Sequence, residues 1–178
     1  QPYRALFEQH ISRYLGADVA AAAGVTLDIQ LAPSAQLPLP DESVDTVLST
    51  QVLEHLANPA LYLRECRRVL KLGARLIITV PMQWRHHEVP YDYLRFTRFG
   101  IVNLLETAGF EVDIAQPCGG VFALIGQILD NALATRGHHQ RWLMKMINRT
   151  ALALDRRYPD YEDTLLWMCL ARASHSGS

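Results

Sequence analysis

The sequence has 178 residues, with 17 Lys and Arg against 18 Asp and Glu and a formal net charge of −1. This length suits one domain with a substantial core and is too short for two ordinary domains. A composition that is 49% hydrophobic and 20% charged excludes a disordered chain. The lack of a basic excess argues against a nucleic-acid partner.

Three cysteines lie far apart in the chain, at Cys66, Cys118 and Cys169. This odd, scattered set indicates neither a disulfide framework nor a zinc site, and it is typical of small core residues in a reducing, cytoplasmic compartment. No apolar run reaches the roughly 20 residues that a membrane-spanning helix needs. We expect one domain over residues 1–173 and a disordered tail over 174–178.

The predicted elements of the first part of the chain are a helix and three strands. Apolar residues at helical spacing predict a helix over residues 3–13. Short strands are expected over 14–18 and 25–29, and a turn-rich stretch follows. The apolar segment 44–49 predicts a strand that is buried on both faces.

The middle of the chain predicts a helix, a strand and a long loop. Pro59 suits the first turn of a helix that runs to about Lys71, with Gly73 ending it. The basic residues of this helix are expected to form a solvated face. Residues 74–80 are the clearest strand, and 81–97 form a loop rich in aromatic residues and histidine.

The last part of the chain also alternates between predicted helices and strands. Residues 99–108 predict a helix closed by a glycine, and 110–115 predict a strand. Two more helices are expected near 121–135 and 139–157, and a last strand over 164–171. Strands that alternate with helices imply an α/β fold with a parallel sheet.

Three motifs stand in order along the chain. They are Leu37-Pro-Leu-Pro-Asp-Glu-Ser-Val-Asp45, Thr46-Val-Leu-Ser-Thr-Gln-Val-Leu-Glu-His55 and Arg68-Val-Leu-Lys-Leu-Gly73. Together they resemble the stretch around the fourth strand of class I S-adenosylmethionine-dependent methyltransferases of the type 11 group. The resemblance continues through Ala108-Gly-Phe110 and covers roughly residues 3–115.

The resemblance implies a Rossmann-like sheet with helices on both faces. It also implies that the last strand inserts antiparallel between 74–80 and 110–115. The family's first strand and glycine-rich loop would lie before Gln1, so this sequence lacks them, and an upstream segment is expected to supply them. The implied activity is methyl transfer from S-adenosylmethionine to a small molecule or to a glycan or cell-envelope intermediate. The alternative is a non-catalytic module that has lost cofactor binding.

The resemblance places the cofactor at the ends of the predicted strands. An acid at a strand end accepts hydrogen bonds from ribose hydroxyls, a loop borders the adenine, and the crevice beyond the fourth strand holds the rest. The residues expected there are Asp18, Ala35, Gln36, Leu37, Ser49, Thr50, Gln51 and His55. For Asp18 the alternative is a helix cap or a turn acid, and for Gln51 it is a polar helix start. Glu54 and His55 are expected to stabilise local structure rather than perform chemistry, with His55 still flanking the cofactor pocket.

The loop at 81–97 is expected to face the acceptor. His87 suits a general base because its ordinary pKa lies near neutrality, and Asp92 would either orient it or accept a substrate hydroxyl. The predicted binding wall consists of Trp84, Tyr91, Tyr93 and Arg95, with Arg95 holding an anionic group. Alternatively, Asp92 and Arg95 pair only to brace the loop. Adjacent histidines lack a recurrent metal spacing, so no metal is predicted.

The segment 121–149 joins a strongly apolar stretch to a basic one. A cover over the substrate pocket, a homodimer surface, a peripheral membrane contact and ordinary packing with a solvated basic face all fit this pattern.

Overall fold

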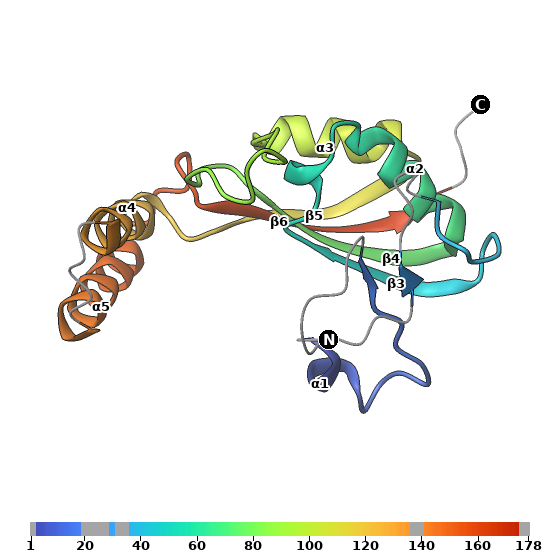
Figure 1. The fold of residues 1–178 in the computed structure, drawn as a ribbon, viewed down its shortest axis with the longest axis horizontal. Coiled ribbons are helices and arrows are strands. Elements are labelled where there is room, and N and C mark those ends of the chain that lie inside the picture. Colours follow the sequence, from blue (N-terminus) through green and yellow to red (C-terminus); the bar gives the residue numbers. More distant parts are fainter. Residues whose placement is uncertain (1–2, 19–28, 31–35, 136–140, 175–178) are drawn as a thin grey trace.

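A computed structural model describes residues 3–18, 29–30, 36–135 and 141–174. Its strands form a two-stranded sheet, β1-β2, and a four-stranded sheet in the order β3-β4-β6-β5 (Figure 1). The elements are α1 Arg4–Phe7, β1 Ala17–Asp18, β2 Ile29–Gln30, β3 Val44–Thr50, the 3-10 helix η1 Leu53–His55, α2 Pro59–Val69, β4 Leu70–Pro81, α3 Arg98–Thr107, β5 Phe110–Cys118, α4 Val121–Thr135, α5 Arg141–Arg157 and β6 Leu166–Ala173.

The last strand, β6, lies antiparallel between β4 and β5, which confirms the prediction for its place. Cys169 pairs with Ile78 on one side and with Ala115 on the other. The direction follows from the connection: β5 ends at Cys118, the chain leaves through α4 and α5, and it returns at Leu166, the partner of Cys118. A strand that re-enters where its predecessor left must run the opposite way.

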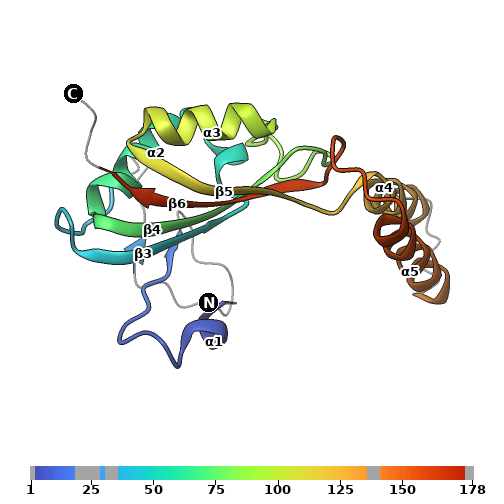
Figure 2. The same ribbon diagram turned by 180° about the vertical axis from the view of Figure 1, so that it is seen from behind.

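Helices α2 and α3 cover one face of the four-stranded sheet, whereas α1 and the two-stranded sheet lie on the other side (Figures 1 and 2). The buried core belongs to the face under α2 and α3. It includes Leu63, Cys66, Leu76, Ile78, Ile101, Leu105, Cys169 and Ala171. Every second residue is buried in β6 and over residues 76–80 of β4, the pattern of strands packed mainly on one face.

The prediction that 44–49 is buried on both faces is wrong for β3. Only Ser49 is fully buried there, and Asp45 and Thr46 are exposed. Within the described residues, β3 pairs with β4 alone, and β1 and β2 pair only with each other. One edge of β3 therefore has no strand partner in the described part of the chain.

The predicted boundary between helix and strand at Gly73 is also wrong. Helix α2 begins as expected at Pro59, where the side chain of Asn58 accepts from the backbone N–H of Leu61, but it ends at Val69. Strand β4 begins at Leu70, which pairs with Val44 and is fully buried. Strand pairing and burial at Leu70 outweigh the helical pattern, and Gly73, with φ +74°, lies inside the strand.

The expected helix over 3–13 is only the single turn α1. No residue of α1 is buried, and the side chain of Leu6 is 73% exposed. Short helices need tertiary packing for stability, and α1 has no buried side chain to supply it. The expected strand at 14–18 is reduced to β1, and most of the expected strand at 25–29 lies outside the described residues.

Arg67 and Arg68 of α2 brace the structure, so the expected solvated face is wrong for these two residues, whereas Arg64 and Lys71 are exposed. Arg68 donates to Glu65 and to the carbonyl oxygens of Leu37 and Leu39. Arg67 donates to the carbonyl oxygen of Ser174 at 2.6 and 2.9 Å. Ser174 also donates to the carbonyl oxygen of Gly109 through its backbone N–H and its hydroxyl. Ser174 is thus fastened to the domain, and residues 175–178 lie outside the described part.

Helices α4 and α5 form a pair that projects away from the four-stranded sheet (Figures 1 and 2). They pack where Gly126 meets Ala151. Large apolar side chains of both helices are exposed: Ile125, Ile128, Leu129, Trp142, Met146 and Leu152. Homodimer and membrane contacts through this pair stay predictions. Among the described helices, none is long and apolar enough to cross a membrane.

Candidate functional site

The candidate site lies where the parallel strands β3 and β4 end. These strands run side by side up to the pair Thr50 and Thr79, so their carboxyl ends share one edge of the sheet. The loop after β4 folds back over η1, since the backbone N–H groups of Tyr93 and Leu94 donate to the carbonyl oxygen of Glu54 at 2.8 and 3.2 Å. Two segments more than 30 residues apart thereby form one site. In open α/β sheets, ligands bind in the crevice outside such strand ends.

The turn after β3 has an unusual backbone at Gln51. Its φ is +53°, in the left-handed region that non-glycine residues rarely adopt. Two bonds to β4 hold it: the backbone N–H donates to the carbonyl oxygen of Thr79 at 3.0 Å, and the side-chain amide donates to the Thr79 hydroxyl at 3.2 Å. Strained residues of this kind often occur at ligand sites, and a role for Gln51 in binding the cofactor stays a prediction.

Ser49, in contrast, points into the core. It is 1% exposed, and its hydroxyl accepts a hydrogen bond from the Tyr62 hydroxyl at 3.0 Å. Burial raises the pKa of Tyr62 far above its usual range. The Ser49 side chain therefore serves the packing of α2 on the sheet, and the half-buried Thr50 is the last residue of β3.

Glu54 is the most unusual polar residue at this edge. It is 0% exposed, and neither of its carboxylate oxygens has a hydrogen-bond partner among the described residues. Removal from water raises the pKa of this carboxyl group. Its Oε1 lies 3.8 Å from Nε2 of His55 and 4.0 Å from Nε2 of His87. We call these three residues the Glu54 cluster.

Both histidines of the Glu54 cluster are oriented through Nδ1. Nδ1 of His55 lies 2.7 Å from the carbonyl oxygen of Tyr91, and Nδ1 of His87 lies 3.3 Å from that of Arg85. A carbonyl oxygen only accepts, so each Nδ1 carries the hydrogen, and Nε2 of a neutral ring keeps its lone pair. The rings meet edge to face, with centroids 4.7 Å apart.

Asp92 and Arg95 form the brace that was the alternative for this loop. The carboxylate accepts from both terminal nitrogens of Arg95, at 2.6 and 2.9 Å, and from the backbone N–H of His87 at 3.1 Å. Arg95 also donates to the carbonyl oxygens of Trp84 and Arg85. The bonds from Arg95 hold the pKa of Asp92 far below its usual range. Asp92 Oδ2 lies 3.7 Å from Nδ1 of His87, so an orienting role stays a prediction.

The expected binding wall lies in two places. Trp84 borders a cavity of about 470 Å³ between the loop and α4, which also has three amide side chains in its lining. These are Gln83, Gln127 and Asn131. Tyr91 and Tyr93 are exposed elsewhere on the loop, and the guanidinium of Arg95 is engaged in the brace. Another hollow, bordered by Asp41 and Arg68, lies against α2 and contains none of the expected site residues.

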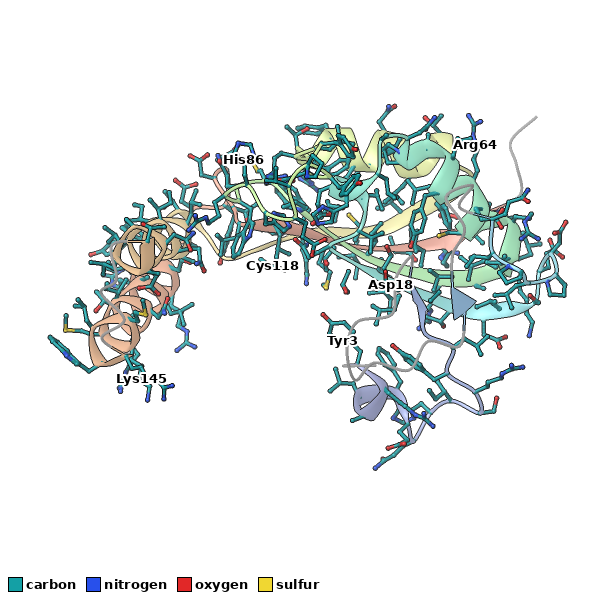
Figure 3. The ribbon with its side chains drawn as sticks, in the orientation of Figure 1. Tyr3, Asp18, Arg64, His86, Cys118 and Lys145 are labelled. Atoms are coloured by element: carbon teal, nitrogen blue, oxygen red, sulfur yellow. The ribbon has the colours of Figure 1, made fainter. Side chains whose placement is uncertain are left out.

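The residues expected to contact the ribose and the adenine belong to other parts of the chain than β3, η1 and the loop after β4. Asp18 is exposed at the end of β1, on the opposite side of the four-stranded sheet from helices α2 and α3 (Figure 3). Gln36 is exposed, and the backbone of Leu37 is bound to Glu65 and Arg68 of α2. Ala35 lies outside the described residues.

Sequence reasoning missed Glu54 as a site residue and treated it as local structure. The signal was an acid four residues after the apolar strand β3, in a helical turn whose neighbour Leu53 is fully buried. An acid is almost never fully buried without a partner, but burial is not visible in the sequence.

Comparison with known proteins identifies relatives of this chain. Residues 5–78 match the family model described as a methyltransferase domain. A probable S-adenosylmethionine-dependent methyltransferase of Mycolicibacterium smegmatis is 38% identical over 93 residues, which are 49% of this chain and 36% of that protein. The chain therefore spans little more than a third of the length of this relative.

Solved structures share the fold. A putative methyltransferase in complex with the Haloferax volcanii Trm112 methyltransferase activator has a TM-score of 0.63 and 23% identity, over 97% of this chain and 77% of that one. The Burkholderia thailandensis 1,6-didemethyltoxoflavin-N1-methyltransferase, with bound 1,6-didemethyltoxoflavin and S-adenosylhomocysteine, has a TM-score of 0.61 and 15% identity, over 96% of this chain and 65% of that one. These likenesses show a Rossmann-like methyltransferase fold.

Proposed function

We propose that this chain, which matches the class I methyltransferases of the type 11 group over residues 5–78, belongs to an enzyme that transfers a methyl group from S-adenosylmethionine to an oxygen of a small molecule or glycan intermediate. The observation that carries the proposal is the convergence of Gln51, the Glu54 cluster and the loop after β4 at one sheet edge. The relationship to a probable S-adenosylmethionine-dependent methyltransferase supports the reaction.

The residues at the ends of β1 and β3 fit the cofactor. S-adenosylmethionine supplies an electrophilic methyl group on a sulfonium, so the protein has mainly to align an acceptor with it. The exposed carboxylate of Asp18 would accept hydrogen bonds from the ribose hydroxyls. The strained turn at Gln51 would present backbone and side-chain groups to the rest of the molecule.

The cavity beside Trp84 supports an acceptor with several hydroxyl groups. Trp84 and amide side chains line it together, a combination of apolar surface and hydrogen-bonding groups. Sugar rings offer both an apolar face and hydroxyl groups, so this lining favours a glycan or another polyhydroxylated compound as the acceptor.

His87 is the proposed proton acceptor. An acceptor hydroxyl must lose its proton as its oxygen attacks the methyl group, and Nε2 of a neutral His87 has a lone pair for it. The bond from Nδ1 to the Arg85 carbonyl fixes the ring, and the bond from the His87 backbone to Asp92 fixes the loop.

Cofactor binding is the first test, and it needs the full-length protein. Calorimetry should show binding of S-adenosylmethionine and S-adenosylhomocysteine, and Asp18→Ala should weaken both by about 1–3 kcal/mol, the cost of unpaired polar groups. Failure of the intact, folded protein to bind either compound would leave a non-catalytic module as the better description.

Turnover is the second test, with methyl-labelled cofactor and a panel of glycan acceptors. His87→Ala should lower turnover by about 10²–10⁴-fold and leave cofactor affinity unchanged. His86→Ala is the matched control, because the His86 side chain is 89% exposed and lies next to His87 in the chain. Equal turnover of the two variants would remove the base assignment and keep the loop only as a binding element.

A further inference from the structure

We propose that the Glu54 cluster is a binding site for one divalent cation of the zinc class, with Glu54 Oε1, His55 Nε2 and His87 Nε2 as its ligands. The proposal concerns these three side chains. It would replace the role of His87 as the base, but it stands or falls separately from methyl transfer by S-adenosylmethionine itself. The sequence predicted no metal, because the adjacent histidines His86 and His87 lack a recurrent metal spacing, and it did not group His87 with Glu54 and His55.

The donor atoms are close enough to share one ion. One ligand atom from each of the three residues lies within 4.8 Å of the other two, and Oε1 of Glu54 is 3.8 and 4.0 Å from the two Nε2 atoms. Zinc bonds to nitrogen and oxygen of about 2.0–2.2 Å with tetrahedral angles place neighbouring donors about 3.4 Å apart. Closing the cluster around an ion therefore requires only small side-chain movements.

The histidines are already arranged as ligands. A histidine that binds a metal usually donates its other ring N–H to a carbonyl or carboxylate, which fixes the tautomer and the direction of the ring. The carbonyl oxygens of Tyr91 and Arg85 stand in that position, at 2.7 and 3.3 Å from the two Nδ1 atoms. In each neutral ring the lone pair is then on Nε2, the atom nearer Glu54.

The burial of Glu54 is a second observation, independent of the donor distances, that points to a cation. Its carboxyl group is wholly buried, and both oxygens lack a hydrogen-bond partner within the described residues. An unpaired buried carboxylate is expensive, so such groups either bind a proton or contact a cation. A cation between Glu54 and the two imidazoles would remove this cost.

The donor set selects the kind of ion. Two imidazole nitrogens and one carboxylate oxygen suit zinc and neighbouring transition metals, whereas magnesium and calcium prefer oxygen ligands. Three protein ligands leave one position open, which is typical of catalytic rather than structural zinc sites. His87 Nε2 would then be a ligand and could not accept the proton of the acceptor hydroxyl. An ion at this site would instead lower the pKa of a hydroxyl bound at its open position.

The test is metal binding by the full-length, untagged protein, purified with a chelator and without S-adenosylmethionine. Titration with zinc against a chromophoric chelator should show one tight site per chain, and cobalt should give the visible absorption of a tetrahedral complex. Glu54→Gln and His87→Gln should each weaken zinc binding by at least about tenfold, the least that loss of a supporting group around a metal costs. His86→Gln and Glu88→Gln, on the same loop, should bind as the parent does.

The outcomes separate the two proposals. Absence of a tight site, or a site that survives in both ligand variants, would overturn the cation proposal and leave His87 as the base. Two different ligand variants guard against misfolding, and each is checked by circular dichroism. Tight zinc binding without any binding of S-adenosylmethionine would uphold the cation site and overturn the proposed function.

Discussion

The carboxylate of Asp155, near the end of α5, accepts a hydrogen bond from the backbone N–H of Gly120, just before α4, at 2.8 Å. It also accepts from the backbone N–H groups of Phe122 and Ala123 at 3.0 and 3.3 Å. One side chain thus satisfies three of the N–H groups that a helix start leaves unpaired. This contact joins the two helices of the projecting pair where the pair leaves the sheet.

Asp155→Ala should therefore destabilise the protein by about 1–3 kcal/mol, because buried N–H groups lose their acceptor. Urea unfolding followed by circular dichroism measures the change. Arg156→Ala, an exposed neighbour on α5, is the control and should stay close to the parent. A loss no larger than that of the control would mean that the cap is energetically unimportant.

The contact between Gly126 and Ala151 leads to a test of helix packing. A Cβ at Gly126 would lie 2.9 Å from the Cβ of Ala151, too close for two carbon atoms. Gly126→Ala adds about 1 kcal/mol of helix propensity, but overpacking costs about 1–3 kcal/mol, so we expect a net loss of stability. In an Ala151→Gly background the clash is gone, and the same change should be stabilising. A double-mutant cycle by urea unfolding that finds additive effects would contradict this packing.

Glu65 should make stability depend on pH. Its carboxylate accepts from Arg68 at 2.6 and 2.9 Å and from the backbone of Leu37 at 2.7 Å, and the bonds from Arg68 are the main reason that its pKa is lowered. The stabilisation is complete above the unfolded pKa of about 4.3 and is lost as the pH falls through the folded value.

We therefore expect the parent protein to lose more stability than Glu65→Gln between about pH 5 and pH 3. The free energy of unfolding in urea, measured at several pH values, gives the comparison. Glu106→Gln changes an exposed acid on α3 and should follow the parent curve. Parallel curves for the parent and Glu65→Gln would show that the Arg68 network is not coupled to folding.

The three cysteines should differ in reactivity. Burial raises the pKa of the Cys66 thiol to about 12 and that of Cys169 to about 11, and the two side chains are 1% and 0% exposed. Cys118 is only partly buried. With a thiol-specific chromogenic reagent at about pH 8, Cys118 should react first and the other two only on unfolding, since the thiolate is the reactive form.

Cys118→Ser should remove this first phase and leave the slow one. Rapid labelling of three thiols in the folded protein would be inconsistent with the buried places of Cys66 and Cys169 in the core.

Several parts of the fold could be predicted from the sequence because their signals are local or are carried by a family motif. The segment 74–80 identified β4 as the clearest strand, and the helical pattern before it identified α2. The place of β6 between β4 and β5 came from the resemblance. The end of α2 could not be predicted, because it depends on the pairing of Leu70 with Val44, a contact between distant residues.

The candidate site, too, could be predicted from the sequence only in part. The sequence by itself determined that histidine and acidic groups follow two strand ends, and that His87, Asp92 and Arg95 share one loop. Only the tertiary structure decided that Ser49 is a core residue, that Arg95 is committed to Asp92, and that Glu54 is buried beside His55 and His87. The physical reason is that burial and donor direction arise when the loop after β4 folds onto η1. No spacing along a single chain segment records that contact.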